Sequence, residues 1–183
     1  MQVINMIVPN NMRSAPTAVS AAAADAASRT TGAVLEELLT QTIRLRDLYK
    51  YARRQVPSTQ FGELRRTLDD HYQEQLSLVD VIVDRIRVLG GTVGVFASEF
   101  LHSSQVCRPL RGPGALNRLI HDLLEAHESV LSAARPHYSN DDHQWMRDFV
   151  VGQVVLTNEQ QCELVGGMLL KNEPQQRLSQ AEI

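Results

Sequence analysis

The chain has 183 residues, enough for one domain with a sizeable core, and nothing in it indicates a second domain. Hydrophobic residues make up 43% and charged residues 21%, as in ordinary globular proteins, and the net charge of −3 is too near neutral to indicate a nucleic-acid partner. No apolar run approaches the roughly 20 residues of a membrane helix, so no membrane contact is expected.

The compartment is predicted from the N-terminus and the cysteines. The first residues lack the basic start and the apolar stretch of a signal peptide, which favours a cytoplasmic protein. Cys107 and Cys162 lie far apart without a CxxC pattern. We interpret them as reduced thiols, with a disulfide between them as the alternative.

The first half of the chain predicts a tail and two helices. Residues 1–30 are rich in Ala, Ser, Thr, Asn and Pro without a sustained period, so a flexible tail is expected. From Thr31 apolar residues recur at helical spacing until Pro57. Ser58 is a suitable N-cap for a second helix, which should stop at Gly90-Gly91.

A long connection with a predicted short helix at 95–101 leads into the second half. A third helix is predicted over 115–134 and a fourth from a cap at Ser139 or Asn140 to about Lys171, before a polar tail at 172–183. No segment alternates strongly enough to predict a strand. Four helices over 31–171 with a long middle crossover indicate an all-α, ferritin-like four-helix bundle.

The second helix carries a polar stripe. Arg65, Asp69, Asp80 and Asp84 fall on one face at helical spacing. Asp69 and Asp80 are about 16 Å apart along the axis, too far to share a metal within one chain. Two copies packed antiparallel would bring Asp69 of one beside Asp80 and Asp84 of the other, so a metal site here must lie between subunits. Solvated or salt-bridged aspartates are the alternative.

These residues lie in segments that resemble a known family. The sequence is similar to Dps, the bacterial mini-ferritins also called DNA-binding proteins from starved cells, over residues 31–171. The segments that carry the resemblance are Leu48–Val56 (LYKYARRQV), Asp69–Asp80 (DDHYQEQLSLVD), Asp84–Gly91 (DRIRVLGG), Leu123–Glu128 (LLEAHE) and Thr157–Glu159 (TNE). The resemblance implies a homo-oligomeric cage, expected to be a dodecamer, which stores iron.

The resemblance also implies an iron-oxidising centre between subunits, built from histidines and carboxylates. Its carboxylate positions fall on Asp69, Asp80 and Asp84, and its two histidine positions fall on Arg53 and Arg65. Guanidinium stays protonated and has no lone pair to offer a metal, but it binds carboxylates well. An Arg–Asp network is therefore expected instead of an intact centre. His71 is a weaker candidate ligand, because it lies roughly 160° around the helix from Asp69.

The resemblance further implies acidic pores near the start of the fourth helix, where Asp141, Asp142 and Asp148 lie. Helix N-capping explains the first two equally well. The remaining histidines, His121, His127, His137 and His143, show no ligand spacing and are expected to have no role in the site. Neither tail has a basic cluster, so DNA binding should be weak or absent.

Two functions follow from these expectations. The first is a mini-ferritin that oxidises Fe(II) with peroxide or oxygen and keeps the ferric mineral inside the cage, protecting against oxidative stress. The alternative is a non-catalytic cage or DNA-protection protein whose ferroxidase site is replaced by Arg–Asp pairing. A helical adaptor or regulatory bundle is a more remote third class.

Overall fold

The first two helices form an antiparallel hairpin. In the computed structural model, which describes residues 18–57, 61–91, 114–138 and 144–180, α1 covers Ala18–Gln55 and α2 covers Gly62–Val88. α1 begins at Ala18, before the regular apolar period that starts at Thr31. The intervening residues are rich in alanine, which favours helix without producing an amphipathic pattern. Side chains are described only for 30–57, 61–91, 114–138 and 144–168.

The end of α2 confirms the stop predicted at the glycine pair. The Gly90 N–H bonds to the Arg87 carbonyl at 2.9 Å and the Gly91 N–H bonds to the Ile86 carbonyl at 3.0 Å. These two bonds form a Schellman motif, and they require the left-handed backbone of Gly90, with φ of 81°. Ser58, the predicted N-cap of α2, lies outside the described residues, as does the predicted short helix at 95–101.

The second helical pair begins with α4, Ala115–Ala134, at the predicted bounds. A short 3-10 helix, η3 (Arg135–His137), follows it around Pro136. The fourth helix has three parts, α5 (Gln144–Phe149), the π-helical segment η5 (Val150–Val155) and α6 (Leu156–Gln180). Its predicted caps lie outside the described residues, and its helical backbone continues past Lys171.

The wider π-helical turn has a defined bond. The Leu156 N–H reaches back five residues to the Val151 carbonyl, besides its contact with the Gln153 carbonyl. Such segments change the register between the residues before and after them. The residues of α6 that face the bundle interior are therefore not in a simple 3.6-residue period with those of α5.

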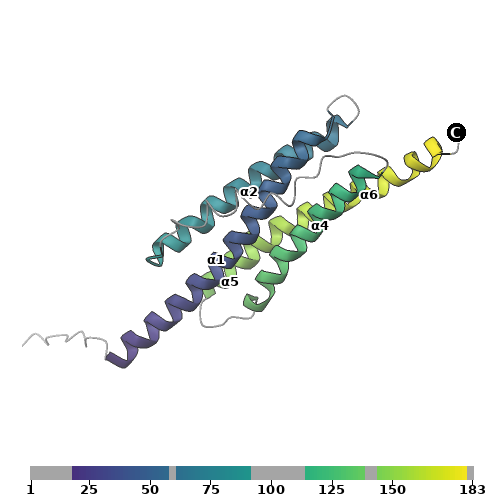
Figure 1. Ribbon diagram of the computed structural model, residues 1–183. Coiled ribbons are helices and arrows are strands. Elements are labelled where there is room, and N and C mark those ends of the chain that lie inside the picture. Colours follow the sequence, from purple (N-terminus) through teal and green to yellow (C-terminus); the bar gives the residue numbers. More distant parts are fainter. Residues whose placement is uncertain (1–17, 58–60, 92–113, 139–143, 181–183) are drawn as a thin grey trace, which may run out of the picture.

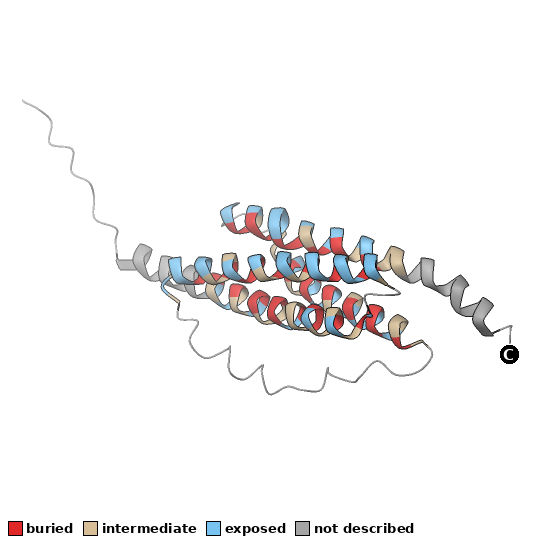
Figure 2. Ribbon diagram, turned by 90° about the horizontal axis from the view of Figure 1, so that it is seen from above, coloured by how far each residue is buried: buried red, intermediate tan, exposed pale blue. Residues whose placement is uncertain are grey.

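All the described elements are helical, and they pack as a four-helix bundle (Figure 1). α1 packs against α2 on one side and α4 on the other, α4 packs against α6, and α2 and α6 complete the ring. Buried faces point inward and exposed faces outward along each helix (Figure 2). None of the helices within the described ranges is long and apolar enough to cross a membrane.

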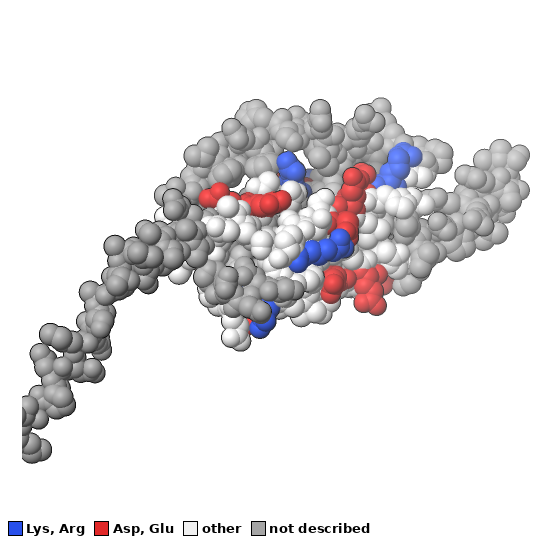
Figure 3. All heavy atoms as spheres, turned by 90° about the horizontal axis from the view of Figure 1, so that it is seen from below, with Lys and Arg blue, Asp and Glu red and all other residues white. Residues whose placement is uncertain are grey.

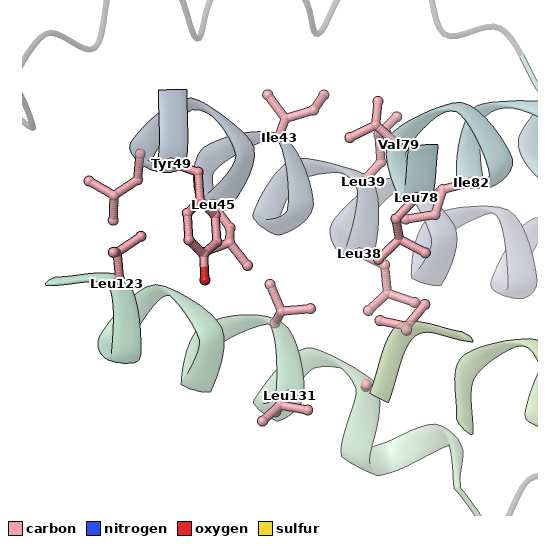
Figure 4. Close-up of a cluster of buried hydrophobic side chains, with 14 of the residues drawn as sticks. Leu38, Leu39, Ile43, Leu45, Tyr49, Leu78, Val79, Ile82, Leu123 and Leu131 are labelled. Carbon is pink, nitrogen blue, oxygen red and sulfur yellow. The ribbon is translucent and has the colours of Figure 1, made fainter. Parts of the chain in front are cut away.

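The core between the helices is aliphatic, as the low aromatic content of 5% predicts. Two aromatic side chains are buried in the described core, Phe149 and Tyr49, and the ring of Tyr49 is fully buried among leucines (Figure 4). Its hydroxyl points toward α4 in that view. Fully buried aliphatic side chains of the core include Leu35, Leu38, Leu45, Ile82, Leu123, Val130, Val150, Val154 and Val165.

Candidate functional site

The polar stripe of α2 lies on the outside of the subunit. Arg65, Asp69, Asp80 and Asp84 are all exposed, on the side of α2 opposite its core residues. The side chain of Asp69 is 52% exposed and that of Asp84 is 73% exposed. The stripe is thus available to another copy of the chain.

The two altered positions, Arg53 and Arg65, have different partners. Arg53, in the last turn of α1, forms an ion pair with Asp69 and lies over the ring of Tyr72, 4.3 Å from its centroid. Arg65 donates instead to the backbone carbonyl of Val56, at 3.1 Å. Arg53 therefore neutralises Asp69, the first carboxylate of the stripe. Arg65 binds a backbone carbonyl at the C-terminal end of α1, where carbonyls lack a partner within the helix.

The other two carboxylates are remote from this pair. Asp84 bonds to Arg87 at 3.2 Å, within the last turns of α2. Asp80 forms no ion pair or hydrogen bond with the described part of the chain. The subunit does not bring Asp69 together with Asp80 and Asp84, in line with their separation along the helix.

The residues of one subunit do not fit an iron centre. Within the described ranges no three His, Cys, Asp or Glu side chains are grouped so that they could hold a metal. Guanidinium groups occupy the positions where histidine ligands were expected, and one of them is already paired with Asp69. The arrangement is suited to binding carboxylates or other anions.

Of the candidate pore residues, Asp148 is described. It is exposed on α5, and its carboxylate lies 3.8 Å from the Arg147 guanidinium. Asp141 and Asp142 lie outside the described residues.

A second polar cluster lies inside the bundle. The Tyr49 hydroxyl is 3.0 Å from Nδ1 of His71 and 2.7 Å from Nε2 of His127. Nδ1 of His127 is 2.8 Å from the side-chain oxygen of Asn158. All four side chains are buried, and they come from four different helices. His71 therefore faces the core and not the acidic stripe.

The donor and acceptor of each of these hydrogen bonds can be assigned by starting from Asn158. The amide nitrogen of Asn158 donates to the Val154 carbonyl at 2.6 Å, so its oxygen is the acceptor for His127. Nδ1 of His127 then carries the proton, and neutral Nε2 accepts from the Tyr49 hydroxyl. Nδ1 of His71 in turn donates to the Tyr49 oxygen. The chain runs from His71 through Tyr49 and His127 to Asn158.

Two glutamines extend this network to the surface. Gln75 donates to the Gln161 side-chain oxygen at 2.9 Å and lies 3.3 Å from that of Asn158. Gln161 donates to the exposed Glu74 at 2.6 Å. The network thus crosses from α1 to α6 and ends at a solvated carboxylate.

Burial keeps the network uncharged. Desolvation lowers the pKa of His127 from 6.5 to about 4, against the opposing effect of the Asn158 hydrogen bond. Desolvation also lowers the pKa of His71, although Glu74 and Asp70 oppose it, and raises the pKa of Tyr49. Both histidines are therefore neutral near pH 7.

The interior network is not a metal centre. Both ring nitrogens of His127 are occupied by hydrogen bonds, and none of the buried side chains in the described core is a carboxylate. Its role is to join the four helices through fully buried polar groups.

The sequence predicted no role for His127 and no interior network. The signal in the sequence was the position of each histidine around its helix relative to the buried apolar residues. His127 falls in line with Leu123, Val130 and Ala134, and His71 with Leu68 and Leu78, on the buried face of each helix. Histidines inside an apolar stripe indicate a buried polar cluster more directly than ligand spacing does.

Cys162 is the cysteine that the structure describes, and it is a free, half-buried thiol. Burial raises its pKa to about 11, so the thiol stays protonated.

Comparisons with known proteins agree with this fold. The family model described as Ferritin-like domain matches residues 32–143. The "Uncharacterized protein in bpoA2 5'region" of Kitasatospora aureofaciens is 32% identical over 101 residues, which cover 55% of this chain and 67% of that protein. The solved structure of DpsC from Streptomyces coelicolor superimposes with a TM-score of 0.62 at 30% identity, over 76% of this chain and 83% of that one.

The network yields a prediction for Tyr49→Phe. Losing the hydroxyl leaves Nδ1 of His71 and Nε2 of His127 buried without their partner, which should lower the free energy of unfolding by about 1–3 kcal/mol. Urea denaturation at one fixed protein concentration measures this. Tyr72→Phe is the matched control, since Tyr72 is only half-buried, and its effect should stay within about 0.5 kcal/mol. Equal losses in the two variants would contradict the assigned role of the Tyr49 hydroxyl.

The lowered pKa of His127 predicts acid sensitivity. Between its ordinary pKa of 6.5 and about 4, the unfolded chain binds a proton that the folded chain does not. Stability should therefore fall as the pH drops through this window, by up to about 1.4 kcal/mol per pH unit for this histidine. His127→Gln should reduce the slope, measured by urea denaturation from pH 7.5 to 4.5. An unchanged slope would mean that other groups cause the loss.

Proposed function

Because the chain is a Dps-like member of the ferritin-like family, we propose that it is a mini-ferritin cage subunit that holds ferric iron, with an altered site between subunits. The observation that supports this most is the four-helix bundle together with its likeness to DpsC over most of both chains. Iron is the cargo in this proposal. Oxidation at the altered site is not part of it, because the site residues do not suit a metal.

Two features of the subunit surface support the proposed assembly. Asp80 and Asp84 of α2 point outward and lie far along the helix from Arg53 and Arg65 of their own chain, so they can meet these arginines only on a second copy packed antiparallel. The last helical stretch also exposes large apolar side chains that contacts between subunits would cover, namely Trp145, Val151, Leu156 and Leu164. We propose a homo-dodecamer, as the family resemblance implies.

At the proposed two-fold axis, charge pairing replaces metal binding. Arg53 is held by Asp69 of its own chain, which leaves Asp80 and Asp84 to face the arginines of the neighbouring copy. Guanidinium–carboxylate contacts across an axis are directional and often bidentate, so they fix the register of the two helices. The pairing thereby stabilises the dimer from which the cage is built.

Weak DNA binding at most is part of the proposal. The face in Figure 3 carries acidic and basic side chains side by side over a largely uncharged surface, without a continuous basic track among its described residues. The first 30 residues hold only Arg13 and Arg29 as basic groups, with Asp25 between them. Binding to duplex DNA depends on neutralising several neighbouring phosphates. The proposed setting is the cytoplasm.

The proposal predicts a closed assembly that retains iron. Analytical ultracentrifugation of the purified chain at micromolar concentration should show a dodecamer. After aerobic addition of Fe(II), ferric iron should co-elute with the protein in size-exclusion chromatography, whereas a protein-free blank should precipitate. A monomer or dimer alone, or iron lost as in the blank, would contradict the storage function.

Restoring the histidines tests the altered site. In the double variant Arg53→His and Arg65→His, neutral imidazoles can contribute lone pairs beside Asp69 and the partner's carboxylates. The initial rate of Fe(II) oxidation should rise severalfold, and Zn(II) should give an anomalous diffraction peak at the two-fold interface. Arg53→Lys with Arg65→Lys, which keeps the charge, is the matched control and should leave the rate low. A metal bound by Asp80 and Asp84 in the unmodified protein would overturn the charge-pair account.

A further inference from the structure

A basic cleft lies where the hairpin of α1 and α2 turns. It has a volume of about 540 Å³ and is lined by Arg53 and Arg54 at the end of α1 and by Gly62, Arg65, Arg66 and Asp69 at the start of α2. Four guanidinium groups face one carboxylate there, so the cleft carries a net charge of +3. That is a strong local concentration in a chain whose total charge is −3.

The four arginines are not equally occupied. Arg53 is paired with Asp69, and Arg65 donates to the Val56 carbonyl. Arg54 and Arg66 are exposed and have no hydrogen bond or ion pair with the described residues. Two fixed guanidiniums therefore frame the cleft, while two others can turn their donors toward a ligand.

The backbone adds further donors on the same side. α2 begins at Gly62, which lines the cleft, and its N-cap Phe61 makes no side-chain capping bond. The first N–H groups of a helix have no partner within the helix, and the positive end of its dipole favours an anion. Glu63 lies in this first turn but does not line the cleft.

We propose that this cleft binds a small oxyanion with the chemistry of inorganic phosphate. Guanidinium groups bind tetrahedral oxyanions through paired N–H donors, and a helix start adds backbone N–H groups. The four arginines are gathered in one local cleft, which suits a small anion, whereas a nucleic-acid backbone needs a longer basic track.

The cleft lies within one subunit, so it does not depend on the proposed assembly or on iron. If the partner's Asp80 and Asp84 approach the cleft in an assembly, they supply two negative charges against a net +3, and Asp84 is already paired with Arg87. Positive charge therefore remains for an anion even when the subunits pair. Bound anion and partner carboxylates would then share the arginines.

The test is isothermal titration calorimetry of the full-length, iron-free protein with sodium phosphate. The buffer has low salt and contains no phosphate or sulfate. We expect saturable binding at one site per chain. The double variant Arg54→Gln and Arg66→Gln should weaken it about tenfold or more, equivalent to at least about 1.4 kcal/mol. Lys50→Gln with Arg44→Gln, which removes the same charge from exposed positions outside the cleft, is the matched control and should bind as the unmodified protein does.

Several results would overturn the proposal. They are the absence of saturable phosphate binding in the unmodified protein, equal weakening in the cleft and control variants, and unchanged binding in the cleft variant. Duplex DNA that binds more tightly than phosphate, and depends on Arg54 and Arg66, would reassign the cleft to nucleic acid. Since no iron is present, a negative result here leaves the storage function untouched. As a control, circular dichroism and ultracentrifugation check that each variant keeps its fold and assembly.

Discussion

The arrangement of the bundle depends on the hydroxyl of Tyr49. This one group accepts a hydrogen bond from His71 of α2 and donates one to His127 of α4, which in turn bonds to Asn158 of α6. A buried donor or acceptor that loses its partner is costly, so each helix is held at one rotation about its own axis. Aliphatic packing alone is less selective, because leucine and valine contacts tolerate small rotations.

The rotation of α2 determines where chemistry can take place. With His71 and Gln75 directed inward, the acidic stripe must point outward, since residues two apart lie nearly opposite each other on a helix. The interior is left with neutral histidines and amides, and the carboxylates of the stripe lie on the outer surface of the subunit. The same constraint therefore produces an uncharged core and a charged subunit surface.

At that surface, arginine stands at the two positions where the resemblance to Dps implies histidine. Histidine can be neutral and offer a lone pair, whereas guanidinium stays cationic and can only donate. Arg53 pairs with the Asp69 carboxylate, and Arg65 donates to the Val56 backbone carbonyl. Arg54 and Arg66 line the same cleft. The hairpin end consequently carries a net positive charge, next to the acidic stripe of α2.

The sequence by itself determined the helical class, the bounds of α4, the stop at Gly90 and the outward stripe of α2. These depend on local rules, namely apolar periodicity, the left-handed glycine and the 100° step of a helix. It did not reveal the start of α1 at Ala18, the π-helical segment or the partner of Arg65. Nor did it reveal that His71 and His127 meet at Tyr49. Those features join residues that are distant in the chain, or shift the register within a helix, so only the packing of four helices against one another could decide them.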